Sequence, residues 1–139
     1  MSTKRIQCLC GDVKIELNGE PFAQVYCHCD NCQTAHSAAY VPVAMYPKDA
    51  VKVVAGKTLS WSVMRTPRVT CTRCGTRLFQ EPPNFPVRGV NAMLMPSGSF
   101  KAMWHQQCQH SVAPIADALP HYRGYPTAIG GANDDLIGW

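Results

Sequence analysis

Seven of the eight cysteines of this 139-residue chain fall into three clusters along the sequence. The clusters are Cys8 and Cys10, then Cys27, Cys29 and Cys32, and then Cys71 and Cys74. Thiolates one or two residues apart can occupy adjacent corners of one tetrahedron around zinc, with Zn–S bonds of about 2.3 Å. A glycine follows the second cysteine of the first and last clusters, as Gly11 and Gly75, and allows the tight turn that points backbone N–H groups at sulfur. The spacing therefore indicates zinc ligands rather than seven unrelated buried thiols.

Seven thiolates divide most simply into a closed site of four and an open site of three. Closed tetrahedral zinc sites hold folds together, whereas sites with an open fourth position do chemistry. We favour joining the first and last clusters, because closing the loop of roughly 60 residues between Cys10 and Cys71 costs about 3.6 kcal/mol of chain entropy. A structural zinc, worth roughly 10–16 kcal/mol, offsets that cost. Spacing alone also allows Cys29 and Cys32 to pair with the last cluster in a zinc ribbon, so both divisions stay open at this point.

Five further side chains carry separate expectations. His36 follows the middle cluster and could serve as a fourth zinc ligand or a proton carrier, the alternative being a surface histidine of a helix. Alternation along an extended segment points His28 away from the metal. We expect His105 to be a core histidine and Cys108 a buried thiol. Asp117 is expected at a turn, where it accepts hydrogen bonds from backbone amides.

The elements that must position these clusters show mostly period-two spacing. Apolar and polar residues alternate over 13–17 and 59–63, which is typical of half-buried strands. Further β-rich segments follow, separated by turn signals, at 22–26, 40–45, 51–54, 68–71, 77–80 and 90–95. Only 31–37, behind Asp30 as N-cap, and 115–119 predict short helical turns. The pattern therefore predicts a mainly β fold.

The composition, 46% hydrophobic and 16% charged, suits one compact domain over 1–139. We expect an ordered core over about 4–122. The tail over 123–139 is rich in glycine and is expected to be extended. It should be ordered only where Tyr125 or Trp139 finds a pocket.

The composition also limits the compartment and the partners. No apolar run approaches the ~20 residues of a membrane span, and no secretory signal precedes the first cysteine. A cytoplasmic location is the expectation that follows, and thiols stay reduced there. Two zinc ions on seven thiolates would lower the formal net charge from +4 to about +1. The apparent basicity is therefore a poor argument for a nucleic-acid partner.

Four segments carry a family resemblance. They are Cys8-Leu-Cys-Gly, Tyr26-Cys-His-Cys-Asp-Asn-Cys, Arg68-Val-Thr-Cys-Thr-Arg-Cys-Gly, and His105 followed by Pro114-Ile-Ala-Asp-Ala-Leu-Pro-His-Tyr122. In this order they resemble the glutathione-dependent formaldehyde-activating enzyme family, which also includes centromere protein V. The resemblance implies a β-tent, that is, zinc-bound antiparallel sheets with few short helical turns.

The resemblance also implies two zinc ions per chain. The structural zinc would be held by Cys8, Cys10, Cys71 and Cys74. The catalytic-type zinc would be held by Cys27, Cys29 and Cys32. Glutathione or another small thiol is the implied cosubstrate.

The sequence departs from the family pattern just after the middle cluster. Gln33, Thr34, His36 and Ser37 stand where family members commonly have an arginine and then a glycine near position 37. We therefore expect an altered pocket rim, so the specific substrate does not carry over with the fold and metals. Five arginines of the middle third could meet a carboxylate-rich ligand such as glutathione, or lie on a solvated strand face: Arg65, Arg68, Arg73, Arg77 and Arg88.

The resemblance and the open three-cysteine site together predict a zinc-dependent carbon–sulfur lyase. A thiol would add to an aldehyde there, or the resulting C–S bond would be cleaved, with His36 near the reacting groups. Two alternatives stay open: a zinc-stabilised binding module without catalysis, and a labile zinc or thiol redox sensor. The sequence leaves undecided the thiol, the aldehyde, the occupancy of the three-cysteine site, and whether the chain forms a homodimer.

Overall fold

The computed structural model describes residues 2–139, and contacts divide the chain into two compact units. Unit 1 comprises the chain up to Ala23 together with Ala44–Phe100, and unit 2 comprises Gln24–Val43 with Lys101–Trp139. Strands make up 39% of the chain and helical turns 14%, which confirms the prediction of a mainly β protein. The expectation of a single domain over 1–139 stays a prediction.

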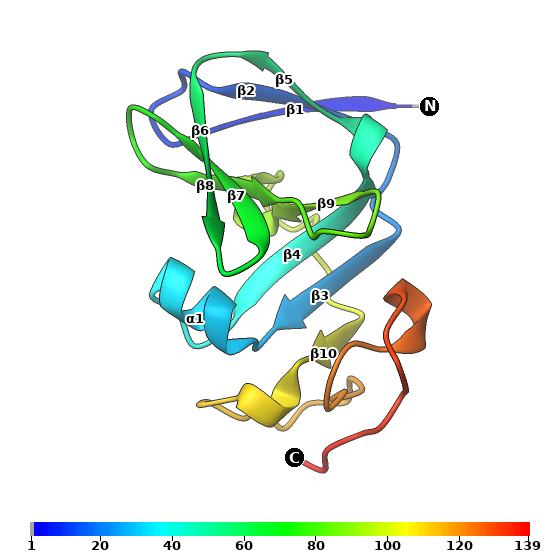
Figure 1. Cartoon of the computed structure of the whole chain (residues 1–139). Helices are drawn as coiled ribbons and strands as arrows, with labels where there is room; N and C mark the ends of the chain where they lie inside the picture. The colour runs from blue at the N-terminus through cyan, green and yellow to red at the C-terminus, as the bar shows by residue number, and fades with distance from the viewer. Residues whose placement is uncertain (1) are drawn as a thin grey trace. The chain divides into compact units, whose positions relative to one another are not determined.

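One sheet of unit 1 has three antiparallel strands in the order β1-β2-β5 (Figure 1). The strands are β1 (Thr3–Gln7), β2 (Lys14–Asn18) and β5 (Val51–Ala55). The predicted alternation sets the register, because Ile15 lies opposite Ile6 and is fully buried, as is Leu17. Lys14 and Glu16, which alternate with these two residues, are only half-buried. Strand β2 therefore turns its apolar face to the core.

The other strands of unit 1 follow the order β4-β9-β8-β7-β6. They are β4 (Val41–Pro47), β6 (Thr58–Val63), β7 (Thr66–Cys71), β8 (Arg77–Gln80) and β9 (Val87–Asn91), and β4 begins in unit 2. The sequence predicted a strand over 90–95, but β9 ends at Asn91. The Asn91 side chain accepts a hydrogen bond from the Met93 amide at 3.0 Å and caps the 3-10 turn η2 (Ala92–Leu94). Local capping by asparagine thus ends the strand.

The apolar core of unit 1 combines inward-facing residues of both sets of strands. Its largest fully buried members are Tyr46, Ile15, Leu17, Leu78, Val13, Val51 and Val90. The 3-10 turn η1 (Lys48–Ala50) connects β4 to β5. Cys8 and Cys71 belong to the apolar core cluster. A substitution at either cysteine therefore changes the packing of the core.

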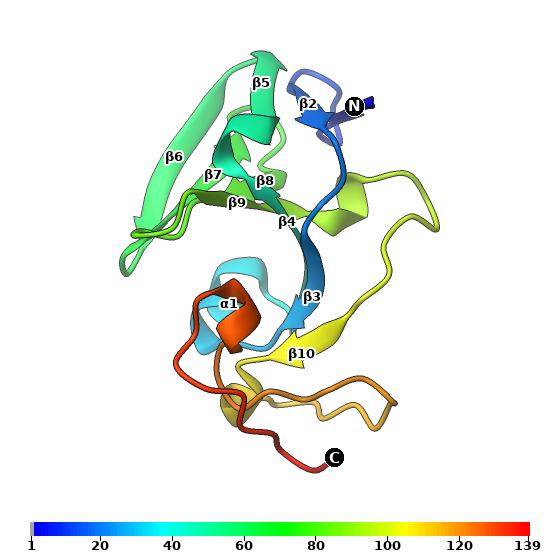
Figure 2. The ribbon, with the colours of Figure 1, turned by 90° about the vertical axis from the view of Figure 1, so that its right-hand side faces the viewer.

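Unit 2 contains two parallel strands, β3 (Ala23–Cys27) and β10 (Trp104–Gln106), which run side by side (Figure 2). The His28 amide donates to the Gln106 carbonyl at 2.9 Å, so the pairing continues past the end of β3. Its helical elements are α1 (Asp30–His36), η3 (Cys108–His110) and η4 (Thr127–Ile129). Within residues 2–139, no helix combines the length and the apolar character that crossing a membrane requires.

Helix α1 begins one residue earlier than predicted, and its N-cap is Cys29 rather than Asp30. The Cys29 sulfur accepts a hydrogen bond from the Cys32 amide at 3.2 Å, which is the contact that a serine or aspartate cap would make. Asp30 lies instead in the first turn, where a negative charge stabilises the helix. The correction matters because the capping atom is also a predicted metal ligand.

The tail of unit 2 makes backbone hydrogen bonds with residues near its own beginning. The Arg123 amide donates to the Asp135 carbonyl at 2.8 Å, and Tyr122 forms an antiparallel bridge with Leu136. The tail therefore folds back along its own beginning. Backbone pairing, rather than a single anchoring side chain, holds it there. Trp139 does find aromatic neighbours, as expected.

Candidate metal centres

Four cysteines of unit 1 meet although 61 positions separate the two pairs. Cys8 and Cys10 follow β1, Cys71 ends β7, and Cys74 lies in the next turn. Their sulfur atoms all lie within 4.8 Å of one another. The turns behind the pairs place Gly11 at φ 84° and Gly75 at φ 74°, in the left-handed region that glycine adopts without strain.

The distances within this four-cysteine group fit a tetrahedral zinc ion. Zn–S bonds of about 2.3 Å give a tetrahedron whose edges are about 3.8 Å. The Cys8 and Cys10 sulfurs are 3.6 Å apart, and those of Cys10 and Cys71 are 3.8 Å apart. The group can therefore hold the ion without rearranging its backbone.

Hydrogen-bond donors point at these sulfurs, as ligation by thiolates requires. The Val13 amide lies 3.3 Å from the Cys8 sulfur, and the Cys74 amide lies 3.5 Å from that of Cys71. The Thr76 hydroxyl, 3.0 Å from the Cys74 sulfur, lowers the pKa of that thiol to about 5. The surroundings thus favour the thiolate form at Cys74 before any metal contributes.

The three cysteines of unit 2 form a second group, also with all sulfurs within 4.8 Å and all buried. Cys27 ends β3, Cys29 caps α1, and Cys32 lies in the helix, where its sulfur is 3.9 Å from that of Cys27. Hydrogen bonds among the three thiols, together with burial, raise the pKa of Cys27 well above its usual value. A divalent cation among the sulfurs would offset that crowding of charge, so the donor set fits a thiophilic metal such as zinc.

The group of four cysteines lies in unit 1 and the group of three lies in unit 2. Loop closure and the family resemblance favoured the same division of the seven cysteines. The pairing of Cys29 and Cys32 with the last cluster is not needed to complete either group. His36 is half-buried at the end of α1 and is not a member of the three-cysteine group. Its part as a fourth ligand or proton carrier stays a prediction.

Two residues that the sequence assigned to the pocket rim have local structural tasks. The Gln33 side-chain amide donates to the His28 carbonyl at 2.7 Å and to the His110 carbonyl at 2.8 Å. Ser37 ends α1 in the left-handed conformation, with φ 50°. Glycine adopts that conformation without strain.

A network of histidines lies beside the three-cysteine segment. His28 Nε2 is 2.9 Å from His105 Nδ1, and His105 Nε2 is 2.8 Å from Asp117 Oδ2. The second carboxylate oxygen of Asp117 is 2.9 Å from His121 Nε2, and Trp139 packs on His121 with ring centroids 4.6 Å apart. The sequence singled out neither His121 nor this network, although Asp117 and His121 stand four positions apart.

The network keeps its histidines buried and His28 neutral. His105 is fully buried with both ring nitrogens engaged, as a core histidine should be. Burial, followed by the neighbouring His105 and His121, lowers the pKa of His28 to about 4. Asp117 also accepts from the Leu119 amide at 3.0 Å, the backbone contact that was expected of it. Burial raises the pKa of the Cys108 thiol to about 12, in keeping with a buried thiol.

Tyr125 is a further side chain of unit 2 whose pKa responds to the charge of the three-cysteine group. The residue is 44% exposed, yet burial around its hydroxyl raises the pKa of the phenol. The nearby charge of Cys27 raises that pKa further, whereas a hydrogen bond with Gln107 acts in the opposite direction. The hydroxyl of Tyr125 is therefore protonated at neutral pH, and no sequence motif had pointed to this residue.

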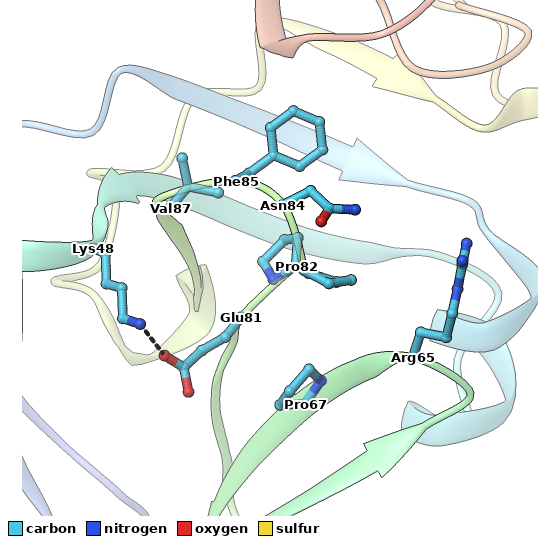
Figure 3. A pocket seen from close by; sticks show the side chains of 9 residues that line it. Lys48, Arg65, Pro67, Glu81, Pro82, Asn84, Phe85 and Val87 are labelled. Atoms are coloured by element: carbon cyan, nitrogen blue, oxygen red, sulfur yellow. Dashed lines mark ion pairs between the residues drawn. The ribbon is translucent and has the colours of Figure 1, made fainter.

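Unit 1 also has a pocket of about 340 Å³, lined by residues of η1, β7 and the 81–87 segment (Figure 3). Lys48 and Arg65 lie on opposite sides of it, and Lys48 is 3.8 Å from Glu81. Of the five arginines considered for a carboxylate ligand, Arg65 is the one that lines this pocket. The other four have partners within unit 1: Arg68 with Gln80, Arg73 with Asp12, Arg77 with the Gly75 carbonyl, and Arg88 with Glu81.

The fold and the two cysteine groups define a mainly β protein able to hold two metal ions on thiolates. A model of the family described as glutathione-dependent formaldehyde-activating enzyme matches residues 3–118. The chain belongs to this family.

Solved structures support the fold. The crystal structure of a Rhodobacter sphaeroides protein from the Northeast Structural Genomics programme superposes with a TM-score of 0.53. It is 21% identical, and the match covers 68% of this chain and 89% of that one, a likeness that concerns the fold alone. None of the curated proteins compared with the chain matched it.

Proposed function

We propose that the chain is a zinc-dependent enzyme of the carbon–sulfur lyase type, acting on the adduct of a thiol and an aldehyde. The reaction would take place at Cys27, Cys29 and Cys32, while the four-cysteine group would hold a structural zinc. The observation that carries the proposal is the three-member group itself. Its three buried sulfurs come from one short segment, and among the described residues no fourth protein ligand joins them.

The chemistry requires a thiol and a carbonyl to be held together. The thiol sulfur forms a bond to the carbonyl carbon and its proton passes to the carbonyl oxygen, and the reverse steps cleave the C–S bond. A zinc ion at the open site would lower the pKa of a bound thiol and polarise the carbonyl. The family description names glutathione and formaldehyde, which supports this class of substrate.

The residues around the group have complementary tasks in this proposal. The Cys32 amide donates to the Cys29 sulfur and withdraws charge from it, which counteracts the electron-rich character of three thiolates. The raised pKa of Tyr125 keeps its hydroxyl protonated, so it can donate a hydrogen bond to the substrate oxygen as negative charge develops. His36, at the end of α1, is the candidate for carrying the thiol proton.

Burial bears on the alternative of a thiol redox sensor. Sensor cysteines are solvent-accessible, since oxidation follows thiolate character and exposure. Cys27, Cys29 and Cys32 are at most 8% exposed. The enzyme proposal is therefore the better supported of the two.

Cobalt substitution tests the proposal directly. Adding glutathione or 2-mercaptoethanol to protein with cobalt in both sites should change the thiolate-to-cobalt charge-transfer band. Cys29→Ser should abolish the change, whereas Cys108→Ser, which alters a thiol outside both groups, should retain it. We also expect glutathione-dependent formaldehyde turnover to be weak or absent, because the residues after Cys32 depart from the family pattern. A band that no thiol moves would contradict the proposed role of the site.

A further inference from the structure

His105, Asp117 and His121 present three ligand atoms at one point of unit 2, outside both cysteine groups. One ligand atom of each residue lies within 4.8 Å of the others. The two nitrogen-to-oxygen distances are 2.8 and 2.9 Å. Two imidazoles and one carboxylate are a donor set that first-row transition metals accept.

The backbone fixes the two histidines next to each other. The His105 amide donates to the Pro120 carbonyl, and the Tyr122 amide donates to the His105 carbonyl, both at 2.9 Å. His105 and His121 thereby form a parallel bridge, and their ring centroids are 4.7 Å apart. The Leu119 amide orients the carboxylate of Asp117. Backbone pairing therefore sets the positions of His105 and His121, and a local turn orients Asp117.

Only small movements separate this hydrogen-bonded arrangement from metal coordination. Metal–ligand bonds of about 2.0–2.1 Å give ligand-to-ligand distances of about 3.3 Å in a tetrahedral site. The observed distances of 2.8 and 2.9 Å, each to a different oxygen of Asp117, are a few tenths of an ångström shorter, so the carboxylate would bind the ion through one oxygen after a small shift or through both. An ion would replace the two protons now shared between the carboxylate and the imidazoles.

The surroundings also supply the outer hydrogen bond that ligating histidines use. A metal-bound imidazole usually has its other ring nitrogen paired, which fixes the orientation of the ring. His105 Nδ1 is already paired with His28 Nε2. Within the described residues His28 Nδ1 has no partner, so the proton of His28 can occupy either nitrogen without breaking a bond. The hydrogen bond between His28 and His105 can therefore be kept when His105 binds a metal ion.

Access to the group comes from the carboxylate side. The side chains of His105 and His121 are 0% and 7% exposed, whereas that of Asp117 is 31% exposed. An ion can reach the group past Asp117 and keep water in its remaining positions. Trp139 packs on both imidazoles, with ring centroids 5.7 Å from that of His105 and 4.6 Å from that of His121.

We propose that His105, Asp117 and His121 form a third metal site, of two nitrogens and one oxygen, for a divalent first-row transition ion. It is distinct from both thiolate groups and independent of the proposed lyase function. Its imidazole and carboxylate donors are harder than thiolates. The site would therefore bind nickel, cobalt or zinc without any sulfur ligand.

The test uses untagged protein purified with zinc, because a histidine tag would bind the probe. Nickel ions are added, and bound nickel and retained zinc are measured in the same sample after gel filtration. We expect one equivalent of nickel to bind while the two equivalents of zinc on the thiolate groups are retained. Asp117→Asn and His121→Gln should lose this equivalent, whereas His110→Gln, an exposed histidine of the same unit, should keep it.

Tryptophan fluorescence gives a second readout that needs no change to the ligands. Nickel at His121 should quench Trp139, whose ring lies 4.6 Å away, with the same midpoint as binding. Trp139→Phe should bind nickel but lack this saturable quenching. Absence of both binding and quenching in the unaltered protein would overturn the proposal, and so would nickel binding that persists in folded Asp117→Asn and His121→Gln. In that case the network is a hydrogen-bonded structural element only.

Discussion

The sulfur atoms of Cys10 and Cys71 lie 3.8 Å apart although 61 positions separate the two residues. Closing a loop of that length costs about 3.6 kcal/mol of chain entropy, which the weak hydrogen bond between two thiols does not offset. A zinc ion at this group would offset the cost several times over. The four-cysteine group is therefore where we expect the stability of unit 1 to depend on metal.

The first prediction compares ligand changes in the two groups. Cys8→Ser or Cys71→Ser should unfold or aggregate the protein, because each removes a ligand that fastens distant strands and lies in the core. Cys29→Ser should cost less than about 1 kcal/mol, because serine keeps the N-cap of α1 while removing a ligand. Thermal melts followed by circular dichroism measure the difference.

Cys29→Ala serves as the matched control for this comparison. Alanine removes both the ligand and the cap, so it should lower stability by about 1 kcal/mol more than serine does. Equal and small losses in all four variants would contradict the assignment of the structural site to the distant pairs.

The second prediction concerns the order in which the metals leave. The three-cysteine group closes only a short local loop and has three ligands, so a chelator should remove its zinc first. Zinc release, followed with a chromogenic chelator, should show two phases, with unfolding only in the second. One cooperative release that coincides with unfolding would mean that both sites are structural.

The cysteine spacing and the alternation of strands could be predicted because both are local properties. Thiolates two or three residues apart have few ways to avoid sharing a metal, and period-two patterns follow from the pleat. The strand register around Ile15 follows from that pattern. The family resemblance then favoured the same division of ligands that loop closure favoured.

The histidine network could not be predicted in this way. It depends on a parallel pairing of β3 with β10, whose paired residues are 79 positions apart, and on a bridge between His105 and His121. Neither pairing has a local signal in the sequence. The end of β9 was misplaced for a related reason, because the hydrogen-bonding side chain of Asn91 outweighed the β propensity of the residues after it.

The third prediction is that Ser37→Gly stabilises the protein by up to about 1 kcal/mol. Ser37 has φ 50° and ψ 47°, a left-handed conformation in which a Cβ atom is strained and glycine is not. Ser37→Ala keeps the Cβ atom and should give no gain, which makes it the control. Chemical denaturation of the three proteins measures the differences, and equal effects of glycine and alanine would show that backbone strain is not the cause.

The fourth prediction separates thiol binding from turnover at the three-cysteine group. Tyr125→Phe removes the hydroxyl whose raised pKa keeps it protonated, while leaving the three sulfurs untouched. If that hydroxyl donates to the substrate oxygen, its loss should lower kcat about tenfold or more, because the hydrogen bond strengthens as charge develops. The change of the cobalt band on adding a thiol should stay as in the unaltered protein, since ligation needs only sulfur.

Tyr122→Phe is the matched control: its ring packs edge-on against Trp104 at 6.0 Å, a contact that phenylalanine keeps. Turnover is measured with the thiol and aldehyde pair that reacts fastest in a screen, and an unchanged kcat in Tyr125→Phe would remove this residue from the mechanism without affecting the proposed metal site.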